Sequence, residues 1–176
     1  MEFQTLIEQR RSVRKYISMP SKEEITEMIR AAQEAPSWKN SQTGRYYCLT
    51  AQETVDSFRS QCLSEGNALK CANAALIITT FVRDRSGFQK DGTPDNELGN
   101  GWGCYDLGLQ NTNLILKAQE LGYGTLIIGI RDADSIRRFL SVPDEEIIVS
   151  VIAVGTPAEE PGRPKRKEPE EILKFL

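Results

Sequence analysis

The chain has 176 residues, with 22 basic side chains, 25 acidic side chains and no histidine. A net charge of −3, with the two signs interspersed, gives no reason to expect a nucleic acid or an anionic membrane as a partner. The absence of histidine excludes a serine or cysteine nucleophile activated by histidine and removes the commonest transition-metal ligand, so no metal site is expected.

One domain, residues 1–176, is the simplest organisation, since a chain of this length buries roughly 70% of the surface that its unfolded form exposes. The four cysteines, at positions 48, 62, 71 and 104, lack the spacing of a metal site and the density of a disulfide scaffold, so we expect reduced, mostly buried thiols. No apolar run approaches the roughly 20 residues that span a bilayer, and the N-terminus lacks a signal-like pattern. A cytoplasmic protein is therefore expected.

The first informative segment is Arg10-Arg11-Ser12-Val13-Arg14. Three guanidinium groups and one hydroxyl within five residues can bind a phosphate through charge-assisted, bidentate hydrogen bonds. The alternative is structural: Phe3, Leu6 and Ile7 mark a short amphipathic helix, and cations at its C-terminal end would interact favourably with the helix dipole. The segment alone leaves both interpretations open.

A helix is predicted from Ser21 to about Ala35, because Ser21-Lys22-Glu23-Glu24 forms a capping box and apolar residues recur on one face. In the turn that follows, Ser, Asn and Gln side chains surround Trp38. Amide and hydroxyl groups beside an aromatic ring suit the edge and the plane of a heterocycle. Alternatively, Pro36 and Ser37 do no more than end the helix. Together, the turn and the arginine segment favour a phosphorylated aromatic cofactor.

The middle of the chain predicts two strands and a long irregular segment. Arg45 to Thr50 and Ala74 to Val82 have the composition of strands, and residues 55–62 between them have helical spacing. Residues 83–103 are rich in Gly, Asp and charge and have no periodicity. Irregular segments of this length are typical of lids, binding loops or disorder, so we consider residues 83–103 a possible lid loop.

Residues 105–121 are predicted to form a helix that is apolar around much of its circumference. In a small chain, its second apolar side favours packing against another subunit. A strand at 125–130, a short helix capped by Asp134 or Ser135, and a strand at 147–154 follow. The alternation of strands and helices predicts a layered α/β or α+β sandwich.

The last segment, residues 155–176, begins with Gly-Thr-Pro, continues through basic residues and ends with Ile172, Leu173, Phe175 and Leu176. A frayed basic tail is one interpretation. Four large apolar side chains are costly to leave in water, however, so we expect the end of the chain to dock on another surface.

Four motifs, in this order, resemble the nitroreductase family of FMN-dependent oxidoreductases over nearly the whole chain. They are R-x-S-x-R at 10–14, A-P-S-x-x-N-x-Q at 35–42, the stretch from Asp106 to Asn111 with its Gly and Gln, and G-x-P at 155–157. The resemblance implies an α+β fold: a three-layer α/β/α sandwich with a central, mostly antiparallel sheet. It also implies a single FMN-binding domain, residues 1–176, that forms a homodimer. In that dimer the C-terminal arm, residues 155–176, would wrap the partner and add a strand to its sheet, and the subunits would share the active site.

The resemblance also assigns roles to residues at matching positions. Arg14 matches the basic residue at the pyrimidine edge of the flavin, where a cation stabilises the negative charge gained on reduction, so it is the predicted catalytic residue. Arg10, Arg11 and Ser12 match contacts to the phosphate and the ribityl chain of FMN.

The remaining matches are spread over the chain. Pro36, Ser37, Trp38 and Asn40 match the loop that reaches the flavin of the other subunit. Family members often carry a small hydroxyl residue where this chain has Trp38, and stacking on the substrate is the alternative role for this indole. The other predicted contacts are Ile128 and Gly129 over the far face of the ring, Asn67 at the pyrimidine edge, and Lys165 and Arg166 at the phosphate.

The implied reaction is a two-step exchange. NADH or NADPH donates hydride to FMN and leaves, and a small electron-poor aromatic acceptor, such as a nitroaromatic or a quinone, then takes the electrons. Solvent supplies the protons, which fits a chain without histidine. The alternatives are a flavoprotein of the same fold that dehalogenates, dehydrogenates or cleaves flavin, and a non-catalytic flavin-binding protein. A nucleic-acid-binding module with a basic arm is disfavoured by the nearly neutral charge.

Overall fold

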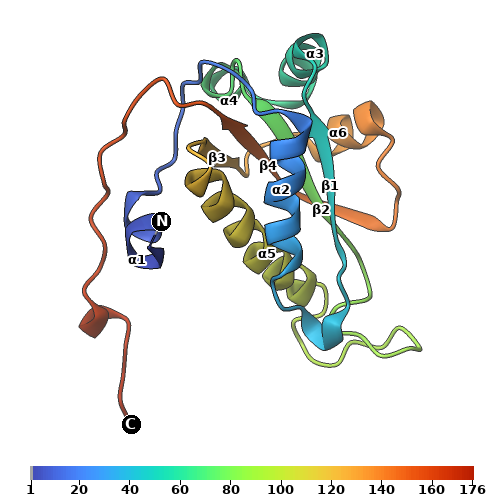
Figure 1. The fold of residues 1–176 in the computed structure, drawn as a ribbon. Helices are drawn as coiled ribbons and strands as arrows, with labels where there is room; N and C mark the ends of the chain where they lie inside the picture. Colours follow the sequence, from blue (N-terminus) through green and yellow to red (C-terminus); the bar gives the residue numbers. More distant parts are fainter. Residues whose placement is uncertain (1) are drawn as a thin grey trace.

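The computed structural model describes residues 2–176 and shows a four-stranded sheet with helices on both faces (Figure 1). The helices are α1 (Phe3–Gln9), α2 (Lys22–Gln33), α3 (Gln52–Cys62), α4 (Glu65–Lys70), α5 (Gly101–Glu120) and α6 (Ala133–Leu140), with short 3-10 helices η1 (Trp38–Asn40) and η2 (Pro169–Glu171). The strands are β1 (Gly44–Leu49), β2 (Ala75–Val82), β3 (Gly124–Ile128) and β4 (Glu146–Gly155). Among residues 2–176, no helix combines the length and the apolar character needed to cross a membrane.

The strands run in the order β1-β2-β4-β3, and each neighbouring pair is antiparallel. The central strands β2 and β4 are buried along most of their length. Because successive side chains of a strand point to opposite faces, Leu76 and Ile78 contribute to one core and Ala75 and Ile77 to another. A sheet that is apolar on both faces needs a layer of helices on each face to keep it from water.

Helices α2 and α5 cover one face (Figure 1). The Ser21 hydroxyl accepts a hydrogen bond from the backbone N–H of Glu24, whose carboxylate accepts one from the backbone N–H of Ser21, so the predicted capping box is confirmed. Met28 and Ala32 of α2 are fully buried, together with Leu114 of α5.

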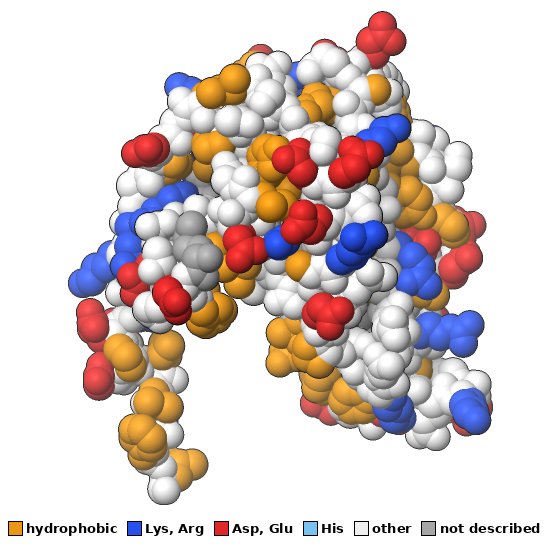
Figure 2. All heavy atoms as spheres, viewed as in Figure 1, with side chains coloured by type: hydrophobic (Ala, Val, Ile, Leu, Met, Phe, Trp, Pro, Cys, Tyr) orange, Lys and Arg blue, Asp and Glu red, His pale blue; other side chains and the backbone are white. Residues whose placement is uncertain are grey.

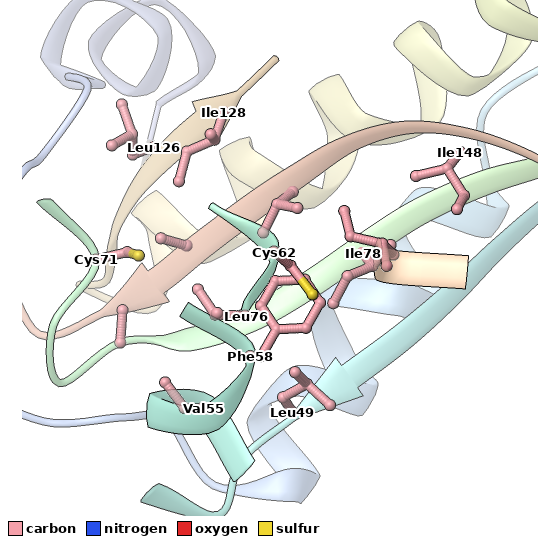
Figure 3. Packing of buried hydrophobic residues seen from close by; sticks show 14 of the residues in the cluster. Leu49, Val55, Phe58, Cys62, Cys71, Leu76, Ile78, Leu126, Ile128 and Ile148 are labelled. Atoms are coloured by element: carbon pink, nitrogen blue, oxygen red, sulfur yellow. The ribbon is translucent and has the colours of Figure 1, made fainter. Parts of the chain in front are cut away.

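Helices α3 and α6 cover the opposite face, with α4 beside α3 (Figure 1). Figure 3 shows this core, in which the ring of Phe58 lies among aliphatic side chains that include Leu76 and Ile78 of β2. Phe139 of α6 packs edge-on against Phe58, with 5.5 Å between the ring centroids. The three-layer α/β/α sandwich and the α+β fold class are therefore confirmed.

Segments from the two ends of the chain pair beside the sheet. The backbone N–H of Ile17 donates to the carbonyl of Thr156, and the N–H of Thr156 donates to the carbonyl of Ser18, each at 2.9 Å. A Cβ atom at Gly155 would lie 2.6 Å from the Ser18 carbonyl oxygen, so this close approach requires glycine. The Gly-Thr-Pro motif thus anchors the start of the C-terminal arm.

Every residue of the arm from 162 to 176 is exposed, and the arm ends below the body of the protein (Figures 1 and 2). The side chain of Phe175 is 91% exposed and that of Ile172 75%. The expected docking of the apolar end therefore does not occur within a single chain.

Several local predictions need correction. Helix α5 begins at Gly101 rather than Tyr105, so the last residues of the predicted lid loop form its first turn. Helix α4 was not predicted, because it has no buried residue and therefore no apolar periodicity. Two of the four cysteines, Cys48 and Cys104, are exposed, against the expectation of mostly buried thiols.

The N-cap residue of α6 was also predicted wrongly. The hydrogen bonds of the observed N-cap residue lead to a prediction about stability and pH. Asp132, not Asp134 or Ser135, occupies the N-cap, and its carboxylate accepts hydrogen bonds from the backbone N–H and the hydroxyl of Ser135 at 3.0 and 2.7 Å. These hydrogen bonds hold the pKa of Asp132 below its ordinary value. A carboxyl group with a lowered pKa in the folded state stabilises the fold above its unfolded pKa, and this contribution is lost as the pH falls through the lowered value.

We expect Asp132→Ala to lower the free energy of unfolding at pH 7, and the difference from the wild type to shrink in acid. Asp134→Ala is the matched control, since its carboxylate lies in the same turn but caps nothing. Urea unfolding from pH 7 to pH 3 measures both. Equal losses for the two variants at pH 7 would contradict the assignment of the cap.

Candidate functional site

The arginine segment forms a small hollow with the start of the C-terminal arm. This arginine hollow has a volume of about 110 Å³ and is lined by Arg10, Arg11, Ser12, Arg14, Pro161, Gly162, Pro164 and Arg166. Four cations around a hollow of this size, without a carboxylate in the lining, suit an anion such as a phosphate.

Backbone hydrogen bonds place the arginine segment beside β3. Ser12 bridges to Thr125, and the backbone N–H of Val13 donates to the Thr125 carbonyl at 2.9 Å. The side chain of Val13 is 4% exposed, and a Cβ atom at Gly124 would lie 2.5 Å from it. The arginines therefore extend from a backbone whose position depends on the absence of a side chain at Gly124.

The arginine side chains differ in how they are already engaged. Arg11 donates through Nη1 to the carbonyls of Glu8 and Arg10 at the end of α1, as the structural interpretation of this segment expected. Arg14 donates to the Ser12 carbonyl at 3.0 Å, while its backbone N–H donates to Glu159. Within residues 2–176 the guanidinium of Arg10 has no hydrogen-bond or ion-pair partner, so it is free to bind an anion.

A second hollow, which we call the strand hollow, adjoins the first. It has a volume of about 220 Å³ and is lined by Arg14, Asn67, Lys70 and the run Leu126 to Ile130. Arg14 lines both hollows, so an anion site and an apolar strand edge meet at one guanidinium. Apart from atoms of Gly129 itself and its two chain neighbours, no atom lies within 4 Å of the position where a Cβ of Gly129 would be, so there is open space beside this lining residue.

Helix α4 brings two polar side chains to the strand hollow. Asn67 donates through Nδ2 to the carbonyl of Ile130 at 3.0 Å, which ties α4 to the turn after β3. Lys70 lies one helical turn later and lines the same hollow. Sequence analysis missed Lys70, although its spacing of three residues from Asn67 would have placed both on one face had α4 been predicted.

A larger hollow of about 450 Å³ lies beside the arginine hollow, between the end of α1 and the end of α5. Arg11 lines it, but so do Glu159 and Glu160. Two carboxylates oppose the binding of a phosphate, so size does not decide which hollow is the anion site.

The loop that carries Pro36, Ser37, Trp38 and Asn40 lies elsewhere. The backbone N–H of Trp38 donates to Asp106 near the start of α5, whereas β3 follows the end of that helix (Figure 1). A helix of 20 residues is about 30 Å long, so one chain holds two separate groups of predicted residues.

Backbone strain is concentrated in this loop. Lys39, Asn40 and Gln42 have φ values of 49°, 54° and 47°, in the left-handed region that side chains disfavour. Such conformations persist only where the surroundings enforce them, and they are typical of functional loops. Side-chain hydrogen bonds hold the loop, including one from the Gln42 N–H to the Ser37 hydroxyl at 3.1 Å.

The structure thus brings most of the predicted residues into two adjoining hollows and leaves the others apart. The residues brought together are Arg10, Arg11, Ser12, Arg14, Asn67, Ile128, Gly129 and Arg166. Lys165 lines neither hollow and is exposed on the arm. Polar donors beside a flat apolar edge, next to a cluster of cations, fit a phosphorylated heterocycle such as FMN.

Solved structures share this fold. A nitroreductase family protein from Streptococcus pneumoniae TIGR4 superposes with a TM-score of 0.84, over 99% of this chain and all of that one (100%), at 17% sequence identity. A protein from Staphylococcus epidermidis named "putative NAD(P)H:FMN oxidoreductase" also gives a TM-score of 0.84, over 99% of this chain and 96% of its own, at 20% identity. The protein therefore has a nitroreductase fold.

The sequence of the chain identifies its family. The model of the nitroreductase family matches residues 7–78 and 67–156, and the chain belongs to the nitroreductase family. A relative from Methanothermobacter thermautotrophicus, named "Putative NADH dehydrogenase/NAD(P)H nitroreductase", is 27% identical over 98% of this chain and 86% of its own length. Membership of this family supports an oxidoreductase function in general.

Gly124, the first residue of β3, and Gly129, the residue after its end, allow a matched test of how the site is built. Gly124→Ala places a methyl group against the buried Val13 and should lower the free energy of unfolding by about 1 to 3 kcal/mol, the usual cost of overpacking. Gly129→Ala has open space around it and should change stability by less than about 0.5 kcal/mol. Urea unfolding measures both, and a tolerated Gly124→Ala would disprove the packing constraint on the arginine segment.

Proposed function

We propose that the protein is an FMN-dependent oxidoreductase that transfers hydride from NADH or NADPH, through FMN, to small electron-poor acceptors such as nitroaromatics or quinones. The observation that carries this proposal is the junction of the arginine hollow and the strand hollow at Arg14. An anion site joined to a flat apolar edge with polar donors matches a phosphate linked to an aromatic ring. In this proposal residues 1–176 act as one FMN-binding domain.

Each side chain then has a distinct task. Arg10, Ser12 and Arg166 would hold the phosphate, with Arg11 contributing the donors that are not engaged at the end of α1. We also keep the predicted contact of Lys165, on the C-terminal arm, with the phosphate of FMN as part of the proposal. The turn at Ile128 and Gly129 would lie along the ring, where the missing side chain of Gly129 leaves space.

Arg14 is the residue proposed to act in the reaction. When bound, FMN supplies the redox group that passes the electron pair of a nicotinamide to the acceptor. A fixed positive charge at Arg14 would stabilise negative charge that develops beside it, and Asn67 and Lys70 would donate hydrogen bonds to the same edge. Protons come from solvent, since the chain has no histidine.

We further propose a homodimer with shared sites. The loop with Pro36, Ser37, Trp38 and Asn40 lies the length of α5 away from the hollows, so it can reach a cofactor only in a partner subunit. The exposed apolar end of the arm, including Phe175, provides a surface to bury in that partner. Sedimentation equilibrium of the full chain tests this part of the proposal, and a monomer at micromolar concentration would overturn it.

The visible absorption spectrum of the purified protein tests the cofactor. A flavin spectrum, with about one FMN released per chain on denaturation, is expected. Steady oxidation of NADH or NADPH in the presence of menadione would then distinguish an enzyme from a flavin carrier. A colourless protein that stays colourless with excess FMN would disprove the proposal.

Arg14→Ala should weaken FMN binding about 10- to 100-fold or slow flavin reduction, because hydrogen bonds to charged groups contribute about 1.5 to 3 kcal/mol. Lys15→Ala is the matched control, since the neighbouring lysine side chain lines neither hollow. Fluorescence titration with FMN and anaerobic stopped-flow reduction measure the two effects. Unchanged affinity together with an unchanged reduction rate would remove Arg14 from the site.

A further inference from the structure

Both N–H groups of Trp38 donate to carboxylates that lie far from it in the sequence. Its backbone N–H donates to Asp106 Oδ2 at 3.0 Å, and its indole Nε1–H donates to Asp95 Oδ2 at 3.1 Å. Asp106 belongs to α5, whereas Asp95 belongs to the 83–103 segment. The loop of residues 36–42, which contains η1 and which we call the η1 loop, therefore does not position this ring alone. Two segments outside it determine where the ring lies.

The Asp106 carboxylate is a buried junction between three segments. It is 3% exposed, and the same oxygen that accepts from Trp38 also accepts from the hydroxyl of Ser86, which follows β2. A buried carboxylate without its donors would lose the hydrogen bonds that compensate for its burial. The η1 loop, the end of β2 and the start of α5 are thus held together at one atom.

Asp95 makes the second junction. Its side chain is 15% exposed, and Oδ2 also accepts from Lys39 Nζ at 2.9 Å. Lys39 in turn lies over the ring of Trp38, with 5.8 Å from Nζ to the ring centroid. The backbone of Lys39 is in the left-handed region, with φ at 49°.

An aromatic row extends from the clamped ring. Trp102 of α5 packs against Trp38 with 4.4 Å between centroids, and Tyr105 packs edge-on against Trp102 at 5.6 Å. Trp102 is itself fixed, because its Nε1–H donates to Asn96 at 2.8 Å. Tyr105 is 60% exposed, so the row reaches the surface. Electron-rich indole and phenol rings favour stacking with electron-poor aromatic rings.

We propose that Asp95 and Asp106 are positioning residues for an aromatic acceptor: they clamp Trp38 between the 83–103 segment and α5, so that this indole presents a fixed face at the shared site. The proposal rests on the proposed function, which places the η1 loop at the cofactor of the partner subunit. In this arrangement the 83–103 segment acts on the reaction through its contact with Trp38.

The chain contains only two tryptophans, and both belong to this cluster. Coupling between their indole transitions in far-ultraviolet circular dichroism therefore reports the clamp directly, with or without turnover. We expect Asp95→Ala to weaken this signal. It should also lower kcat/KM for menadione about tenfold or more, as expected for loss of a hydrogen bond to a charged group, while the anaerobic rate of flavin reduction by NADH stays the same.

Two further variants make the experiment specific. Asp95→Asn keeps an oxygen that can accept from the indole and loses only the ion pair with Lys39, so it should retain the coupling signal and lie within about fivefold of the wild type. Glu97→Ala removes a carboxylate from the same segment that has no hydrogen-bond partner within residues 2–176, and it should behave as the wild type.

The outcomes separate the two proposals. If Asp95→Ala keeps the coupling signal, or loses it without any change in kcat/KM for menadione, the positioning role is wrong while the proposed function stands. If Asp95→Ala slows flavin reduction as much as turnover, the residue acts on the cofactor and the positioning role is also wrong. A wild-type protein that binds no FMN overturns the proposed function and the positioning role together, before any variant is compared.

Discussion

The paired strands β2 and β4 are the constraint on which the rest of the structure depends. Residues 75–81 of β2 and 150–155 of β4 are buried, so the centre of the sheet has no face that water can cover. The pair must therefore lie between two layers of helices, and strands β1 and β3, each of which includes an exposed residue, become the edges. An edge strand is where a sheet can accept another segment, and the arginine segment bridges to β3 there. The candidate site is a consequence of which strand the core leaves at the edge.

The length of helix α5 determines how far apart the two groups of candidate site residues lie. It packs on the central strands and joins the 83–103 segment to β3, so its 20 residues separate the Trp38 loop from the arginine hollow. If the proposed function is correct, half of a site at each end of one helix would be of little use to a monomer. In the proposed dimer with two-fold symmetry, the same separation would allow each subunit to contribute one half to two equivalent sites. The exposed apolar end of the C-terminal arm gives a physical reason for such a partner.

A feature could be predicted from the sequence when the residues that cause it are close together in the chain. The capping box of Ser21 and the continuous apolar run of β2 involve neighbouring residues, and both were predicted correctly. The start of α5 was missed because Gly101 and Gly103 occupy its first turn and glycine disfavours a helix. Gly103 is nevertheless required there, because a Cβ atom at this position would lie 2.3 Å from the nearest ring carbon of Phe81. The hydrogen bonds of Trp38 to Asp95 and Asp106 span 57 and 68 residues, and no pattern in the sequence marks such distant partners. The arginine segment was found because its chemistry is compressed into five residues.

The two interpretations of that segment, as the end of a helix and as a phosphate site, are compatible in the structure. Arg11 and Arg14 donate to neutral carbonyls of their own segment, which restricts their side chains without using all five donors of either guanidinium. The contacts to the carbonyls are charged on the donor side only, whereas a phosphate would add the opposite charge on the acceptor side, so a phosphate in the arginine hollow could share or displace these contacts. The internal contacts also reduce the conformational entropy that the side chains lose when a ligand binds. The helix end would therefore restrict the arginines before the proposed phosphate binds, and Arg10, which has no such contact within residues 2–176, would lose the most conformational freedom on binding.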